Sequence, residues 1–180
     1  MKQKKIIEWI KQDEMRMQAL KAAQTLNLND WCLAAGFVRN LVWDRLHGLA
    51  QNTPLNDIDV IYFNPANLSP EADREYEQRL NDVIPLPWSV KNQARMHLKY
   101  GREPYTSSSD AISYWVEVET AIGVKLDDNS QLELVAPLGI ESLFGYTISA
   151  NPKHGQPDVL LARAREKGWI RRWPGLSVKI

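Results

Sequence analysis

One stretch, residues 33–63, constrains the fold more than any other part of this 180-residue chain. It predicts a short apolar strand at 31–35, a turn at Gly36, an amphipathic helix, a polar loop and a second apolar strand at 58–63. A strand, a tight turn, a helix and a second strand in direct succession require a sheet with at least one helix packed against it. The stretch therefore predicts an α+β or α/β domain.

Two acidic residues, Asp57 and Asp59, lie at the start of the second strand with Ile58 between them. Alternate side chains of a strand point the same way, so we expect both carboxylates to leave one face of the sheet together. Two negative charges at that spacing raise each other's pKa unless a cation lies between them. The pair therefore predicts a divalent metal site. The alternative is a solvated pair that caps the end of the strand.

The glycine turn upstream adds a second piece of chemistry. Gly36 precedes a helix, and the free N–H groups and positive dipole end of a helix N-terminus favour phosphate. Arg39, one turn into the helix, adds a bidentate donor for the same anion. If the two strands are neighbours, this phosphate site lies beside Asp57 and Asp59, which is the arrangement that phosphoryl or nucleotidyl transfer needs.

The composition excludes several classes of protein. The 22 basic and 22 acidic residues cancel, so no strong overall field marks the chain as a nucleic-acid or membrane binder. Cys32 is the single cysteine, which excludes an intrachain disulfide. No apolar run reaches the ~18 residues that cross a bilayer, and the N-terminus lacks an apolar signal segment. We expect one cytoplasmic domain over residues 1–180, with a core at about 28–137 and helical extensions at both ends.

The rest of the chain supports a mixed architecture. Ser69 and Pro70 are typical of a helix start, and Gly168 of a helix end. The predicted elements are helices at 3–26 with a break near 12–14, at 69–83 and at 156–167, a strand at 88–98, a loop at 99–109 and a hairpin at 121–137.

Three segments carry a resemblance to a known superfamily. LAAGFVRN at 33–40, LHG at 46–48 and DIDV at 57–60 are similar to the head-domain signature of DNA polymerase beta-like nucleotidyltransferases, in the form found in CCA-adding enzymes and poly(A) polymerases. Over residues 15–175 the chain resembles more closely a family of uncharacterised bacterial nucleotidyltransferase-like proteins. WSVKNQARMH, TAIGVKL and the tryptophan-rich C-terminal segment carry that wider resemblance.

The resemblance implies an enzyme that moves a nucleoside monophosphate from an NTP to an acceptor hydroxyl. Asp57 and Asp59 would hold Mg²⁺ or Mn²⁺, Gly36 would contact the triphosphate and Arg39 would assist there. Apart from the resemblance, Lys91, Arg95 and Lys99 predict a basic face that binds the nucleotide triphosphate or nucleic acid, and the alternative is a solvated strand edge. A small molecule, a protein side chain and an RNA end all remain open as the acceptor.

The chain departs from the superfamily pattern at three points. Ala35 replaces the first glycine of a pair, Asn40 replaces an aspartate, and the third carboxylate has no secure match. Glu117 is the preferred third carboxylate, because Glu119 and Glu133 fit equally well as exposed strand residues. Without a third acid, the alternative function is a non-catalytic nucleotide-binding or interaction module.

The C-terminal segment leaves one more alternative open. Its aromatic and basic residues either stack on bases or close the core. They are Trp169, Arg171, Arg172 and Trp173.

Overall fold

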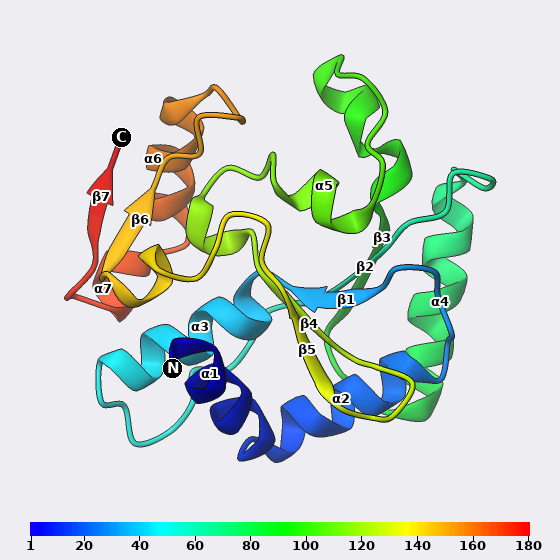
Figure 1. The fold of residues 1–180 in the computed structure, drawn as a ribbon, viewed down its shortest axis with the longest axis horizontal. Coiled ribbons are helices and arrows are strands. Elements are labelled where there is room, and N and C mark those ends of the chain that lie inside the picture. The colour runs from blue at the N-terminus through cyan, green and yellow to red at the C-terminus, as the bar shows by residue number, and fades with distance from the viewer.

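A five-stranded mixed sheet forms the centre of the computed structural model, which describes all 180 residues (Figure 1). Its strands are β1 (Cys32–Ala34), β2 (Ile58–Tyr62), β3 (Trp88–Asn92), β4 (Gly123–Leu126) and β5 (Leu132–Val135). The order across the sheet is β3-β2-β1-β4-β5, and β2 and β3 are parallel whereas the other neighbours are antiparallel. This sheet with its flanking helices confirms the predicted α+β class.

Four helices from the first half of the chain contribute side chains to the larger hydrophobic core. They are α1 (Lys2–Lys11), α2 (Glu14–Gln24), α3 (Gly36–Leu46) and α4 (Pro70–Val83). Side chains at alternate strand positions, such as Leu33, Val60 and Val90, contribute to this core. It is continuous from Ile6 in α1 to Leu176 near the C-terminus.

The helix starts predicted from capping residues are found in the structure as capping hydrogen bonds. The side chain of Asp13 accepts a hydrogen bond from the amide of Arg16, which caps α2 and produces the predicted break between the first two helices. The side chain of Ser69 accepts from the amide of Glu71, and Pro70 begins α4 as expected.

The opposite face of the sheet is covered by shorter elements. They are α5 (Ser108–Ile112) and the 3₁₀ segment η1 (Gln93–Tyr100), whereas a second 3₁₀ segment, η2 (Val118–Thr120), packs against α3. A small cluster of Cys32, Ala34, Ile61 and Ile112 packs on this face. Figure 1 shows α5 on the opposite side of the sheet from α1 and α2.

The prediction of one strand over 88–98 was wrong in its second half. The strand β3 ends at Asn92, where the asparagine side chain accepts hydrogen bonds from the amides of Asn64 and Ala94. These bonds turn the chain into η1, so residues 93–100 form a 3₁₀ segment that includes part of the expected loop. Glu117 and Glu119 likewise lie at η2 and not on a strand.

The C-terminal part packs against α3. It contains η3 (Ser142–Phe144), β6 (Thr147–Ser149), α6 (Pro157–Glu166), α7 (Trp169–Arg172) and β7 (Ser177–Lys179), with β6 and β7 parallel. The rings of Trp169 and Trp173 meet Trp43 of α3 at centroid distances of 5.7 and 5.1 Å. The indole N–H of Trp173 donates to the carboxylate of Asp44 over 2.9 Å. These tryptophans therefore close the core, which is the second of the two expected roles.

No helix combines the length and the apolar character that a membrane crossing requires.

Candidate active site

The two aspartates lie where β2 begins. Asp57 immediately precedes the strand, and Asp59 is its second residue. Across the sheet, Asp59 lies opposite Ser89 of β3 and Ala34 of β1, and Ala34 lies opposite Gly123 of β4. This row of small neighbours leaves space around the carboxylate of Asp59.

Neither carboxylate is used to stabilise the protein. The buried acids Asp44, Glu117 and Glu119 all accept hydrogen bonds, whereas Asp57 and Asp59 accept none and form no ion pair. Burial raises the pKa of Asp59, and the negative charge of Asp57 adds to that rise. A pair of acids held together without partners is suited to a cation that the protein itself does not supply.

The turn into α3 has the geometry that the sequence indicated. Ala35 has φ 58° and ψ −124°, which is a conformation that glycine adopts readily and alanine does not. No side chain caps this end of α3, so its first amides remain available to a ligand. A Cβ atom at Gly36 would lie 3.2 Å from the Nη2 atom of Arg39 and 3.3 Å from the side-chain amide of Asn40, so a larger residue there would require these side chains to shift.

Arg39 lies over this helix end as a buried cation. Its Nη1 donates to the hydroxyl of Thr120 over 2.7 Å, and its Nη2 donates to the side-chain oxygen of Asn40 over 3.0 Å. Its guanidinium stacks on Trp169 and Trp43, with 4.6 and 5.1 Å to the ring centroids. Burial lowers the pKa of Arg39 to about 10, although the carboxylate of Glu117 opposes the shift, so the group stays positive at neutral pH.

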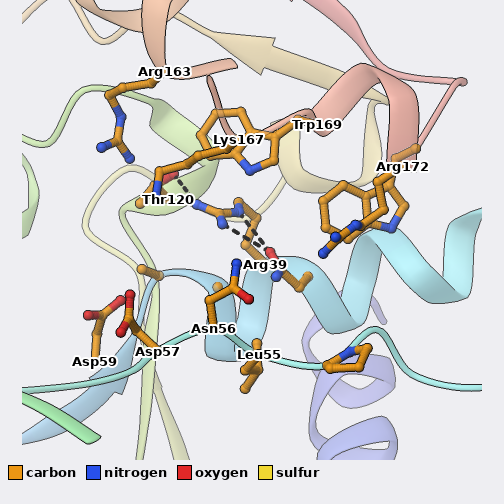
Figure 2. A pocket seen from close by; sticks show the side chains of 15 residues that line it. Arg39, Leu55, Asn56, Asp57, Asp59, Thr120, Arg163, Lys167, Trp169 and Arg172 are labelled. Carbon is orange, nitrogen blue, oxygen red and sulfur yellow. Dashed lines mark hydrogen bonds between the residues drawn. The ribbon is translucent and has the colours of Figure 1, made fainter. Parts of the chain in front are cut away.

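A pocket of about 110 Å³ joins these groups (Figure 2). Its lining includes Gly36, Arg39, Asp57 and Asp59, so four of the predicted site residues lie together. Figure 2 shows the two carboxylates beside each other, with Arg39 at the centre of the view.

The C-terminal helices bring further positive charge to the same pocket. Arg163 of α6, Lys167 directly after it and Arg172 of α7 all belong to its lining. Local sequence signals around 33–63 do not point to them, because they lie more than 100 residues away. The four-residue spacing of Arg163 and Lys167 on a predicted helix is the signal that places both on one face.

Both carboxylate oxygens of Glu117 are held by neighbouring side chains. Its side chain is 1 % exposed, and its two oxygens accept from Nε and Nη2 of Arg163 over 2.7 and 3.2 Å. It also accepts from the hydroxyl of Thr120, which itself accepts from Arg39. No three acidic, histidine or cysteine side chains lie together as a group that would hold a metal ion.

The remaining candidate residues, Lys91, Glu119 and Glu133, lie outside the first pocket. Lys91 of β3 lies opposite Ile61 and does not line the pocket around Arg39. It lines a second cavity that adjoins Asp59. The prediction that Glu119 is an exposed strand residue was wrong, because it is 2 % exposed and accepts hydrogen bonds from Thr147 and Ser149. Glu133 on β5 is exposed as expected.

Comparison with solved structures defines the class of protein. A structure described as a CCA-adding enzyme head domain is 32 % identical, with a TM-score of 0.85 over 98 % of this chain and 95 % of that one. The chain thus has a nucleotidyltransferase head-domain fold. A CCA-adding enzyme in complex with CTP is 15 % identical, with a TM-score of 0.54 over 94 % of this chain and 47 % of that one, and it shares the fold alone.

The family follows from the sequence itself. A family model described as Nucleotidyltransferase matches residues 21–178, and the chain belongs to this family. The predicted membership of the nucleotidyltransferase superfamily is thereby confirmed. No protein with a curated description matches the chain.

Proposed function

We propose that the protein is a metal-dependent nucleotidyltransferase that moves a nucleoside monophosphate from an NTP to an acceptor hydroxyl. The observation that carries the proposal is the pocket in which the unpartnered Asp57 and Asp59 lie near the cations Arg39, Arg163 and Lys167. Family membership and the relative described as a CCA-adding enzyme head domain support the same activity.

The donor set fits a divalent cation. Mg²⁺ binds through one or two carboxylates together with phosphate oxygens of the substrate, and Mn²⁺ accepts the same oxygen ligands. Asp57 and Asp59 provide these two carboxylates and, without a cation, repel each other. When bound, the ion would supply charge stabilisation at the α-phosphate and at the leaving pyrophosphate.

The remaining residues bind and orient the triphosphate. The first amides of α3 after Gly36 and the guanidinium of Arg39 lie at one end of the pocket, where they would contact phosphate oxygens. Lys167 and Arg172 would neutralise further negative charge. Because Lys91 lies on the other side of Asp59, we place its nucleotide contact near the reacting end of the substrate.

The third carboxylate remains a prediction at Glu117. Both of its oxygens are bound by Arg163 and Thr120, so its contacts favour a positioning role for Arg163 and, through Thr120, for Arg39. The absence of a three-acid group favours one alternative, a non-catalytic module that binds nucleotide through the same pocket.

Labelling separates the two functions. Wild-type protein with each α-³²P-labelled NTP, Mg²⁺ or Mn²⁺ and a cell extract should transfer label to a component of the extract. The double variant Asp57→Asn/Asp59→Asn should lose about a hundredfold or more of this transfer. Asp128→Asn, which changes an exposed acid of the β4–β5 turn, is the matched control and should label as wild type does.

A binding measurement completes the comparison. Since a ligand that binds only the folded state raises the melting temperature, NTP with Mg²⁺ should raise it for wild type and not for the double variant. A thermal shift without label transfer would favour the non-catalytic module. Equal labelling by wild type and the double variant would contradict the proposed site.

A further inference from the structure

A second cavity of about 420 Å³ opens beside the first pocket. The two share four lining residues, which are Ala35, Asp59, Thr120 and Arg163. The second cavity extends from Asp59 along β3 and η1 toward α5, on the sheet face opposite α1 and α2. A molecule bound there would reach the acids from the side away from α3.

The lining of this cavity is both cationic and aromatic. Its cations are Lys91, Arg95, Lys99, Arg102 and Arg163, and its large aromatic residues are Tyr100, Tyr105, Tyr114 and Trp115. The acids in its lining are Asp59 and Glu117, of which Glu117 is already paired with Arg163. Such a surface attracts an anion, and the rings favour a planar partner.

Arg102 shows how these two properties are combined. Its guanidinium stacks on the rings of Tyr100 and Tyr114, with 4.4 and 4.8 Å to their centroids. Its Nη1 donates to the hydroxyl of Tyr105 over 3.0 Å, its Nη2 donates to the carbonyl of His154 over 3.2 Å, and it forms no ion pair with a carboxylate. Lys99 lies over the same Tyr100 ring at 5.6 Å. The aromatic residues therefore hold cations that no acid of the protein neutralises.

Two polar atoms of the lining residues also have no partner in the protein. Gln93 is 3 % exposed, and its Oε1 accepts no hydrogen bond. Nη1 of Arg95 donates none, although its Nη2 is paired with Asp73. Both atoms are buried within the wall and are not accessible from the cavity, so they add no ligand contact to it.

We propose that this second cavity binds the acceptor, and that the acceptor carries a nucleotide moiety: a planar base with an attached phosphate. The inference rests on the proposed function, which places the metal and the α-phosphate at Asp57 and Asp59. Unpaired cations would bind the phosphate, and the tyrosine rings would stack on the base. A hydroxyl of a serine or tyrosine side chain in a protein acceptor would leave these cations unused.

The reaction then runs between the two pockets. The acceptor hydroxyl oxygen attacks the α-phosphorus, the bond from this phosphorus to the bridging oxygen of the β-phosphate breaks, and pyrophosphate leaves with the electron pair. Asp59 lines both pockets, so the acceptor hydroxyl and the α-phosphate would meet beside it, and the hydroxyl proton is released to water. No oxidant or further reactant is needed.

Binding of a short oligonucleotide tests the cavity directly. The probe is a 5′-fluorescein-labelled adenylate tetranucleotide with a free 3′-hydroxyl, followed by fluorescence anisotropy. Lys99→Glu and Tyr100→Ala change exposed residues of the lining and should each weaken binding about tenfold. Lys21→Glu makes the same charge change on α2, across the sheet, and should bind as wild type does.

Competition distinguishes two sources of the nucleotide. If unlabelled AMP displaces the probe as well as the unlabelled tetranucleotide does, the acceptor is a free nucleotide. If the tetranucleotide competes and AMP does not, it is a strand end. Inorganic phosphate should compete poorly with both, because it lacks the base.

Three results would overturn the inference: no binding of the probe by wild type, unchanged binding by both cavity variants, or equal weakening by Lys21→Glu. This assay contains no NTP and no metal ion, so its outcome is independent of the labelling experiment. Failed labelling with intact, cavity-dependent probe binding would count against the transferase activity alone.

Discussion

Ala35 has a backbone conformation that costs an alanine free energy. Its φ of 58° with ψ −124° lies in a region that glycine occupies readily and other residues at a cost of about 1–3 kcal/mol. The superfamily pattern has a glycine at this position, and the structure gives the physical reason. The chain retains the turn because the amide of Ala35 donates to the carbonyl of Ile122 and its carbonyl accepts from Arg39.

Ala35→Gly should therefore stabilise the protein. We expect the free energy of unfolding to rise by about 1 kcal/mol, after the greater flexibility of glycine in the unfolded chain is subtracted. Denaturation with urea measures this change. The matched control, Ala34→Gly, lies on β1 at ordinary dihedral angles and should lose about 1 kcal/mol or more. A loss of stability in Ala35→Gly would show that the turn is not strained.

Single residues of the site were predictable where the signal was local. Gly36, Arg39, Asp57 and Asp59 lie within 24 consecutive residues of one strand–turn–helix–strand unit, and they were expected in one site if its two strands were neighbours, as they are. Lys167 was not found, and Arg172 was named only as a residue that stacks on bases or closes the core, because their place in the site depends on how the C-terminal helices pack on α3.

Between elements, one polar chain connects α6 to the helix end at the site. Arg163 on α6 pairs with Glu117, Glu117 accepts from Thr120 at the end of η2, and Thr120 accepts from Arg39 on α3. Each link is buried or half-buried, so a change at Glu117 should move Arg39 and Arg163, two of the cations that line the pocket with Asp57 and Asp59.

Glu117→Gln separates a positioning residue from a third metal ligand. The variant keeps the size of the side chain and loses its charge, so Arg163 is held less firmly. We expect the NTP concentration for half-maximal labelling to rise by roughly three- to tenfold, with metal dependence and maximal labelling retained. Glu133→Gln on the exposed face of β5 is the control and should behave as wild type does. Loss of labelling as complete as in Asp57→Asn/Asp59→Asn would instead make Glu117 the third carboxylate.

At this scale, helices were predicted better than the ends of strands. The periodicity at 69–83 and 156–167, with Ser69 and Gly168 as end signals, gave α4 and α6 nearly to the residue. The strand β3 was overextended because its end depends on Asn92, whose side chain bonds to Asn64 and Asn67 far back in the sequence. Glu119 was misplaced for the same reason, since its partners follow about 30 residues later.

Over the whole molecule, the core extends beyond the segment that forms the sheet. Its buried side chains run from Ile6 and Ile10 of α1 to Trp173 and Leu176, and α1 packs against α3, which begins at the candidate site (Figure 1). The N- and C-terminal helices thus share one core with the sheet, although the sequence suggested extensions around a core at 28–137. A chain organised in this way should unfold as one cooperative unit.

Ile10→Ala tests this cooperativity far from the site. Ile10 is fully buried, so the change should lower the free energy of unfolding by about 2–4 kcal/mol. The unfolding curves from far-UV circular dichroism and tryptophan fluorescence should shift together, because α1 and the tryptophans around Trp43 belong to the same core. Ile180→Ala removes the same atoms from a residue that is 71 % exposed and should change stability by about 0.5 kcal/mol at most. Separate transitions for the two signals would show that α1 unfolds independently, and would confine the cooperative unit to the sheet and the helices that carry the pocket.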